Sequence, residues 1–331
     1  MKIAVIGAGS WGTSIANLLA KKGYEIGIWD IHEEVCKGIN ENKRNPFYIK
    51  DVSLAEMYAS TSAEEILKSS EVVVLGVPSA YVRLVLPKLK SHLSGQKIIS
   101  LAKGLETGTL LRVSQIVEQE LKGLYKSVSV LCGPNHAEEV SLEVPSATVI
   151  SSSVEEDAAE LQKIFMTPYF RVYTNSDLVG VELGGAIKNV IAVAAGMSDG
   201  LGFGDNTKAS MMTRGLAEMK RLGAAMGATA ETFSGLSGIG DLIATCTSRH
   251  SRNRRIGELI GKGISLKDAE AQLGMVAEGV HTSLAVKNLA EQQKVEMPIS
   301  AGVADILFDE RIPADVVKDL MSRGATSENI R

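Results

Sequence analysis

The sequence predicts an α/β domain with a doubly wound parallel sheet, followed by an all-helical domain. Over the first half of the 331 residues, short β-branched and apolar runs alternate with stretches of helical length. Such alternation is typical of repeated strand–helix–strand units. After about Ser176 the patterns are helical, with no convincing strand. We therefore assign residues 1–180 to the sheet domain and 181–331 to the helical domain, each long enough to bury its own core.

The expected strands lack strict alternation of polar and apolar residues, as in a sheet covered by helices on both faces. They are Ile3–Ile6, Ile26–Trp29, Val72–Leu75, Ile98–Ser100, Val128–Leu131 and Ala147–Ile150, with a further edge strand near Tyr169–Tyr173. Between them we expect helices over Ser10–Lys22, Ser79–Leu89 and Thr109–Lys122. The later helices are expected over Leu178–Met197, Thr207–Met226, Leu266–Gln272, Gly279–Gln292 and Ile299–Phe308. Glycine and alanine in the first of these would let other helices approach closely.

Composition excludes several classes of protein. A net charge of −4 gives no general attraction to nucleic acid or to an anionic membrane. Three cysteines at unrelated spacings argue against a disulfide framework, and five histidines show no metal-ligand spacing, so we expect no metal. The start does not resemble a signal peptide, and we expect no membrane span, because no apolar run approaches ~18–20 residues. We expect a cytoplasmic protein.

A glycine-rich turn, Gly7-Ala8-Gly9-Ser10-Trp11-Gly12, follows the first expected strand and leads into a helix. In this setting the turn is typical of a dinucleotide-binding (Rossmann) domain. Gly7 would permit the tight turn, Gly9 the approach of the pyrophosphate, and Gly12 the packing of helix on strand. The alternative is a purely structural strand–turn–helix.

Asp30 ends the second expected strand and bears on the choice of cofactor. A carboxylate there accepts hydrogen bonds from both ribose hydroxyls and repels a 2′-phosphate, which favours NAD. His32, Lys43 and Arg44 lie close enough in sequence to meet a phosphate, so NADP stays open.

Two lysines are candidates for proton transfer. Lys103 follows the strand Ile98–Ser100, at the sheet edge where doubly wound folds bind ligands. Lys188 interrupts a helix that is apolar nearly all round. A lysine there either extends to solvent or is buried with a partner or a task. Burial and neighbouring cations would lower its pKa toward the range useful for proton transfer.

A second glycine-rich turn, Gly235–Asp241, lacks the lysine of a phosphate-binding P-loop. If a helix starts at Asp241, that residue and Thr245 share one face. Alternatively, Asp241 only caps the helix Leu242–Cys246. The basic cluster Ser251–Arg255 follows. Within it, Arg252 is a candidate site residue, and the remaining arginines fit a solvated charge run.

With these residues in view, the chain closely resembles the bacterial NAD(P)-dependent glycerol-3-phosphate dehydrogenases over nearly its full length. The resemblance rests on many spaced motifs in the right order: Gly7–Gly12, Ala102–Leu105, Gly133-Pro134 with Ala137-Glu138, Leu183–Val190, Gly196–Gly200, Thr213–Met219, Gly240–Leu242, Ser251–Arg255 and Val276–Gly279. It implies reversible conversion of sn-glycerol 3-phosphate and dihydroxyacetone phosphate, which supplies the backbone of glycerophospholipids.

The resemblance implies that Lys188 is the proton acceptor. We build on it the hypothesis that Lys103 polarises the carbonyl and that Asp241, with Thr245, orients Lys188. The cofactor-contacting positions are Ser10, Trp11, His32, Lys103, Ala137, Arg252, Val276 and Glu278. The substrate-contacting positions are Lys103, Gly133, Asn135, Lys188, Asp241, Ser251, Arg252 and Asn253, with Arg252 and Asn253 on the phosphate.

Some residues depart from the family pattern. Asn135 stands where the family usually has Ser or Thr, and His136 where it often has Phe. After Trp29 the family often has a small residue and then a basic one, whereas this chain has Asp30 and Ile31. This departure puts the usual preference for NADPH in doubt.

Two rival functions follow from the same residues. A hydroxyacid dehydrogenase or ketopantoate-type reductase also pairs a dinucleotide domain with a lysine-bearing helical domain, but its substrate carries a carboxylate. A non-catalytic redox sensor would bind dinucleotide without needing Lys103, Lys188 and Asp241. The apolar faces of the helical domain make a homodimer plausible.

Overall fold

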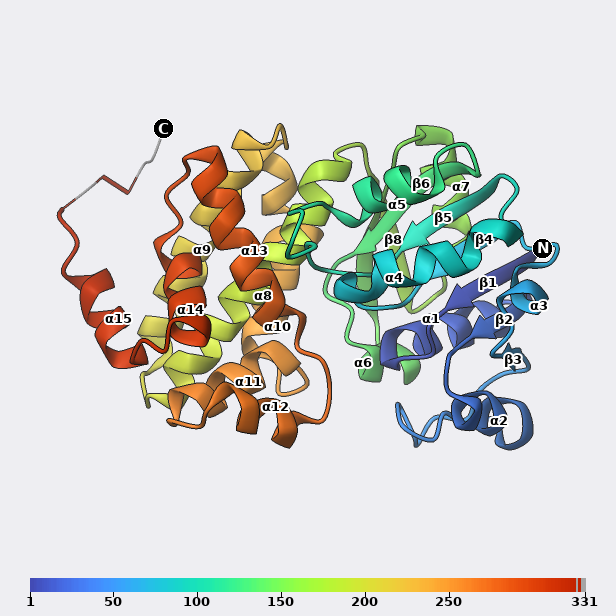
Figure 1. The fold of residues 1–331 in the computed structure, drawn as a ribbon, viewed down its shortest axis with the longest axis horizontal. Coiled ribbons are helices and arrows are strands. Elements are labelled where there is room, and N and C mark those ends of the chain that lie inside the picture. Colours follow the sequence, from blue (N-terminus) through green and yellow to red (C-terminus); the bar gives the residue numbers. More distant parts are fainter. Residues whose placement is uncertain (326, 329–331) are drawn as a thin grey trace.

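The computed structural model describes residues 1–325, 327 and 328, and it has the two-part architecture that the sequence predicts (Figure 1). One part is a single eight-stranded sheet in the order β3-β2-β1-β4-β5-β6-β7-β8. The strands are β1 (Lys2–Ile6), β2 (Glu25–Trp29), β3 (Tyr58–Ser60), β4 (Val72–Leu75), β5 (Gln96–Ser100), β6 (Tyr125–Cys132), β7 (Ser146–Ser152) and β8 (Phe170–Asn175). All neighbours are parallel except β6 and β7. The first six strands have the strand order of a dinucleotide-binding domain.

Helices cover both faces of this sheet, and the central strand β1 shows why its sequence is apolar throughout. Ile3 and Val5 pack into one buried cluster, while Ala4 and Ile6 pack into the cluster on the opposite face. The helices of the first face are α1 (Ser10–Lys21), α2 (Glu33–Asn42), α6 (Ala137–Ser141) and α7 (Glu155–Phe165). Those of the second are α3 (Ala63–Leu67), α4 (Ser79–Leu89) and α5 (Val113–Leu121), with the short turn η1 (Lys90–His92) after α4. A strand with helices on both sides needs no polar face.

The other part is helical and is built around α8 (Leu178–Gly200). Around it lie α9 (Asp205–Ala225), η2 (Ala230–Ser234), η3 (Leu236–Gly240), α10 (Asp241–Thr247), α11 (Arg252–Gly261), α12 (Leu266–Leu273), α13 (Glu278–Gln293), α14 (Pro298–Phe308) and α15 (Pro313–Met321). The small residues of α8 allow the close contact that the sequence predicts. A Cβ on Gly196 would lie 1.9 Å from the carbonyl oxygen of Arg254, and one on Gly257 would lie 2.0 Å from that of Val193. Hence α8 and α11 touch backbone to backbone.

The length of α8 corrects one expectation. The helix is long and apolar enough to cross a membrane, although we expected no apolar run of that length. However, 89% of its most apolar window is buried within the protein. Residues Gly180 to Ser198 are all buried, so α8 is a core helix surrounded by other helices.

The predicted fold class is confirmed, with local differences. Strand β3 was not expected, because among its three residues only Ala59 is buried. Helix α5 begins at Val113 rather than Thr109, since Leu110 is left-handed at φ +63° and Arg112 pairs with Leu105 as an isolated bridge. The change of architecture falls between Asn175 and Leu178, next to our proposed domain boundary.

Candidate active site

A cleft of about 840 Å³ lies where the glycine turn of the sheet domain meets the helical domain. Most of the residues that the sequence singled out line it: Gly7, Gly9, Ser10, Trp11, Asp30, His32, Lys103, Asn135, Ala137, Lys188, Thr245, Ser251, Arg252, Asn253, Val276 and Glu278. Gly12, Gly133 and Asp241 do not line it. The cleft therefore gathers residues from both ends of the chain.

The glycine turn has the geometry that a dinucleotide pyrophosphate requires. Gly7 is at φ +101°, and a Cβ on Gly12 would lie 2.1 Å from the carbonyl oxygen of Gly7. Above Gly9 there is open space, and a Cβ on this residue would have no atom within 4 Å. The N-terminus of α1 has no side-chain cap, and within the described residues the buried Nε1 of Trp11 has no partner. A phosphate group fits the free backbone N–H groups at the start of α1 and the helix dipole, whereas the buried Nε1 of Trp11 is closed off from the cleft.

Asp30 is held beside this turn. One carboxylate oxygen accepts from the backbone N–H of Ala8 at 2.8 Å, and the other accepts from that of His32 at 3.0 Å. Of the three basic residues considered as phosphate ligands, His32 lines the cleft, whereas Lys43 and Arg44 lie elsewhere. Lys43 pairs with Glu56, and the guanidinium of Arg44 donates to the carbonyl of Lys50. Neither lines the cleft.

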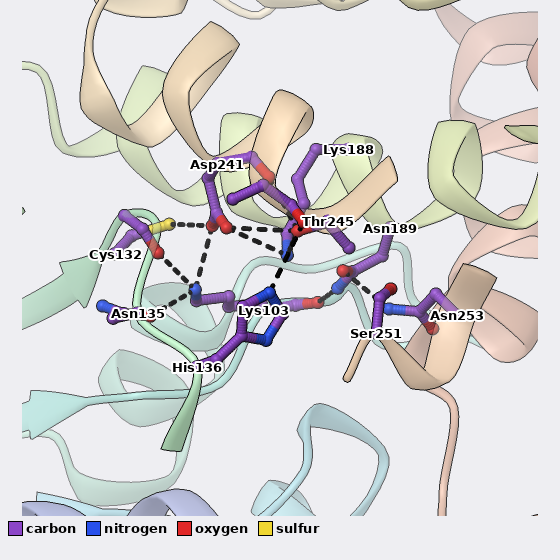
Figure 2. Close-up of polar contacts among 12 residues, drawn as sticks. Lys103, Cys132, Asn135, His136, Lys188, Asn189, Asp241, Thr245, Ser251 and Asn253 are labelled. Carbon is purple, nitrogen blue, oxygen red and sulfur yellow. Dashed lines mark hydrogen bonds and ion pairs between the residues drawn. The ribbon is translucent and has the colours of Figure 1, made fainter. Parts of the chain in front are cut away.

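Lys103, Lys188 and Asp241 form one buried cluster at the other end of the cleft (Figure 2). Asp241 lies between the two lysines: Oδ2 is 2.9 Å from Nζ of Lys103, and Oδ1 is 3.2 Å from Nζ of Lys188. Lys188 also donates to Oγ1 of Thr245 at 2.7 Å, and that hydroxyl lies 3.2 Å from Oδ1 of Asp241. Helix α10 begins at Asp241 itself and has no side-chain cap, so the alternative in which Asp241 only caps this helix is wrong.

Residues of the loop after β6 also hold the ammonium group of Lys103 in place. Its Nζ also donates to the carbonyl of Gly133 and to Oδ1 of Asn135, each at 2.8 Å. Gly133 is at φ +157°, where a Cβ would lie 2.9 Å from Cα of Thr148, so a side chain is excluded there. The thiol of Cys132 lies 3.7 Å from Oδ2 of Asp241. All three cysteines are free, as the sequence predicts, and all three are buried.

The charged groups of the cluster shift one another's pKa values. Burial lowers the pKa of Lys188, and repulsion by Lys103 adds to this, against the attraction of Asp241. Burial would also lower the pKa of Lys103, but its closer contact with Asp241 leaves that pKa raised. Burial opposes ionisation of Asp241, yet the two lysines hold its pKa below the ordinary value. Lys188 is therefore the more readily deprotonated lysine.

Asn189 is a site residue that the sequence analysis did not assign. Its Nδ2 donates to the backbone carbonyl of Lys103 at 2.7 Å, and its Oδ1 accepts from Asn253 at 2.8 Å. Asn253 in turn accepts from the N–H of Gly279 at 2.9 Å. Glu278, the preceding residue, accepts from the N–H of Ser79 at 2.9 Å. The signal in the sequence was a second polar residue beside Lys188 in an apolar helix.

Comparison with known proteins places the chain in a family. Residues 2–158 match the family model described as NAD-dependent glycerol-3-phosphate dehydrogenase N-terminus, and residues 177–318 match the model of its C-terminus. The chain belongs to the glycerol-3-phosphate dehydrogenase family. The glycerol-3-phosphate dehydrogenase (NAD(P)+) of Oceanobacillus iheyensis is 47% identical over 329 residues, 99% of this chain and 95% of that one. A Bacillus cereus protein of the same name is 50% identical over 327 residues, 97% of this chain and 96% of its own.

Solved structures of this family have the same fold. The glycerol-3-phosphate dehydrogenase of Coxiella burnetii superposes with a TM-score of 0.93 at 35% identity, covering 97% of this chain and 99% of that one. A ketopantoate reductase of Ralstonia eutropha has a TM-score of 0.61 at 17% identity, over 96% of this chain and all of that one. The second likeness concerns the fold alone. The ketopantoate-type reductases, the first rival class, therefore have a similar fold, but this chain does not belong to their family.

Proposed function

We propose that this dehydrogenase reversibly interconverts sn-glycerol 3-phosphate and dihydroxyacetone phosphate with NAD or NADP. The observation that carries the proposal is the buried cluster of Lys103, Lys188 and Asp241 across the cleft from the glycine turn, in a chain of this family. The cluster provides a proton-transfer group and a carbonyl-polarising cation in one place. A dinucleotide-binding sensor has no need of either.

The free N–H groups at the start of α1 and the indole of Trp11 would hold the dinucleotide, with Ala137, Val276 and Glu278 along the same cleft. When bound, the nicotinamide supplies or accepts the hydride at the carbonyl carbon. Asp30, fixed between two backbone N–H groups, presents its carboxylate to the ribose hydroxyls and opposes a 2′-phosphate. We therefore propose that this chain prefers NAD.

Lys188 would move the proton. In the oxidation direction neutral Lys188 takes the proton of the substrate alcohol, and in reduction its ammonium form returns it to the developing alkoxide. Thr245 and Asp241 fix two of the directions around Nζ, which leaves another for the substrate. Lys103, whose pKa is raised, stays charged and polarises the carbonyl.

The phosphate of the substrate would bind at the N-terminus of α11. Ser251 caps this ten-residue helix by accepting from the N–H of Arg254 at 3.2 Å. The dipole at the helix start and the guanidinium of Arg252 both favour an anion. Arg252 lines the cleft, where it is placed to bridge substrate and cofactor phosphates. Asn253 offers its second amide N–H.

The test is turnover on dihydroxyacetone phosphate with NADH and with NADPH, compared with 2-oxo acids such as ketopantoate. We expect activity on the phosphorylated triose alone, followed by the absorbance of the reduced cofactor. Lys188→Ala should lose about 10²–10⁴-fold in turnover while cofactor affinity is kept. Activity on the oxo acid instead would support the reductase alternative, and cofactor binding with no turnover would support the sensor.

The product of reduction is the backbone of glycerophospholipids, so we assign the enzyme to lipid synthesis. We place it in the cytoplasm, consistent with three free cysteines. A homodimer remains our prediction, and sedimentation of the purified protein tests it.

A further inference from the structure

Two histidine rings lie beside each other within the cleft, and the proposed reaction steps use neither of them. His136 stands directly before α6, and His250 directly before Ser251, the cap of α11. Their ring centres are 6.3 Å apart, with the planes tilted by 48°. Both residues line the cleft.

The position of His136 relates these rings to the substrate. Its Nε2 lies 3.5 Å from the carbonyl oxygen of Ala244, the neighbour of Thr245, which accepts from Lys188. Figure 2 shows the His136 ring pointing toward the contacts of Lys188 and Thr245. The ring of His250 lies beside it, directly before the cap of α11. His136, His250, Lys188, Thr245 and Ser251 thus line the same cleft.

The charges around His136 make its protonation sensitive to an anion. Burial lowers the pKa of His136, and repulsion by Lys188 and Lys103 lowers it further, against weaker opposing effects of the Ala244 carbonyl and Asp241. Nδ1 has no hydrogen-bond partner within the described part of the chain. On the elements that carry or adjoin the two rings, the other ionisable residues that line the cleft are His250 before α11, Arg252 on α11, and Glu138 on α6.

A phosphate ester bound beside His136 would raise the pKa of its ring. Its two negative charges offset the repulsion by the lysines, and its oxygens accept hydrogen bonds from imidazole N–H groups. The imidazolium form donates from both ring nitrogens, whereas the neutral form donates from only one. Binding of a dianion and protonation of the ring thus favour each other.

We propose that His136 and His250 form a recognition pair for the phosphate ester, and that substrate binding draws one proton from solvent onto His136. The inference rests on the proposed function in placing the phosphate at the N-terminus of α11. It adds two specificity-determining residues and a coupling of substrate affinity to pH.

The first experiment uses inorganic sulfate as a competitive inhibitor of the active enzyme, because sulfate keeps its charge where phosphate titrates. In the native enzyme we expect inhibition to weaken as the pH rises from about 6 to about 8, the range in which histidine changes charge. In His136→Gln and His250→Gln we expect inhibition about tenfold to a hundredfold weaker at the acid end, as for loss of a hydrogen bond to a charged group. For His136→Gln the pH dependence should also disappear.

The matched control is His281→Gln, because His281 is exposed on α13 and does not line the cleft. It should behave as the native enzyme does. The inference predicts a raised KM for dihydroxyacetone phosphate in the cleft variants, with kcat changed by less than about threefold. A loss confined to kcat, or sulfate inhibition with the native pH dependence in His136→Gln, would overturn it.

Calorimetry separates this inference from the proposed function. Binding of sn-glycerol 3-phosphate, measured in two buffers of different ionisation enthalpy, should take up protons in the native enzyme and fewer in His136→Gln. An enzyme that turns over the triose phosphate without this difference contradicts the histidine pair alone. A protein that binds anions through the pair but has no triose phosphate activity contradicts the proposed function alone.

Discussion

The buried cluster holds one negative charge between two positive ones, so removing different members should change stability by very different amounts. In Asp241→Asn, two buried ammonium groups lose their common partner. In Lys188→Met, the pair of Lys103 and Asp241 remains intact and balanced. The side chains are 13%, 6% and 3% exposed for Lys103, Lys188 and Asp241, so solvent screens them little.

The contact distances set the scale. At 2.9 Å and 3.2 Å the two attractions are worth roughly 6 and 5 kcal/mol with an effective dielectric constant of about 20. The measured loss of unfolding free energy is smaller than these attractions, because the structure relaxes around the substitution and because the native ion pair includes the cost of removing its charges from water. Breaking a buried pair by removing one partner typically costs about 3–5 kcal/mol. We expect that cost in the unfolding free energy of Asp241→Asn, and a change within about 1 kcal/mol for Lys188→Met, whose apolar chain fits the same space.

Urea unfolding of the purified proteins near neutral pH, without substrate, measures both values. The double variant Asp241→Asn/Lys188→Met should recover part of the loss, because only one unpaired ammonium remains. If Asp241→Asn were as stable as the native protein, or if Lys188→Met cost as much, the charge arrangement of the cluster would be wrong. In Asp241→Asn the pKa of Lys188 should also fall further, which moves the acid limb of alcohol oxidation to lower pH.

Three further predictions concern pH, cofactor and packing. Because the pKa of Lys188 is lowered, kcat for alcohol oxidation should rise with pH through that pKa. The kcat for reduction, which needs the ammonium form, should fall over the same range. If both values changed with pH in the same direction, Lys188 would not be the proton-transfer group. Asp30→Ala should raise the NADPH to NADH ratio of kcat/KM by about tenfold or more, equal to about 1.4 kcal/mol; a strong preference of the native enzyme for NADPH would contradict the role of Asp30. Gly257→Ala should lower the unfolding free energy by about 3 kcal/mol through its contact with Val193, whereas Gly263→Ala tests only backbone strain at a surface turn.

The fold was predictable where local sequence determines it. Strands β1 and β4 are buried on both faces, and this leaves continuous apolar runs that a sequence shows directly. Strand β3 leaves no such run, because it lies at the edge of the sheet and exposes Tyr58. The antiparallel pairing of β7 with β6 also has no local signal, since pairing direction depends on how the chain returns to the sheet.

The individual site residues could be picked out from local sequence, whereas the arrangement of Asp241 and Thr245 around Lys188 was expected only from the mechanism built on the family resemblance. Lys188 stood out because a cation interrupts an apolar helix, and Lys103 because it follows a strand at the ligand-binding edge. That Asp241 joins them depends on the packing of α10 against α8, which no spacing reveals. The pairing of His136 with His250 is likewise tertiary, since the two are far apart in the chain.

The same cluster ties the two parts of the protein together. Lys103 belongs to the sheet domain, while Asp241 and Lys188 belong to the helical domain, and Asn189 holds the backbone of Lys103 from the helical side. Arg112 and Glu182 make a second buried ion pair across the same boundary. Any movement that separates the parts at this point must first expose Asp241 and break its contact with Lys103. The lowered pKa of Lys188, which arises from its burial and from repulsion by Lys103, therefore depends in part on a residue of the sheet domain.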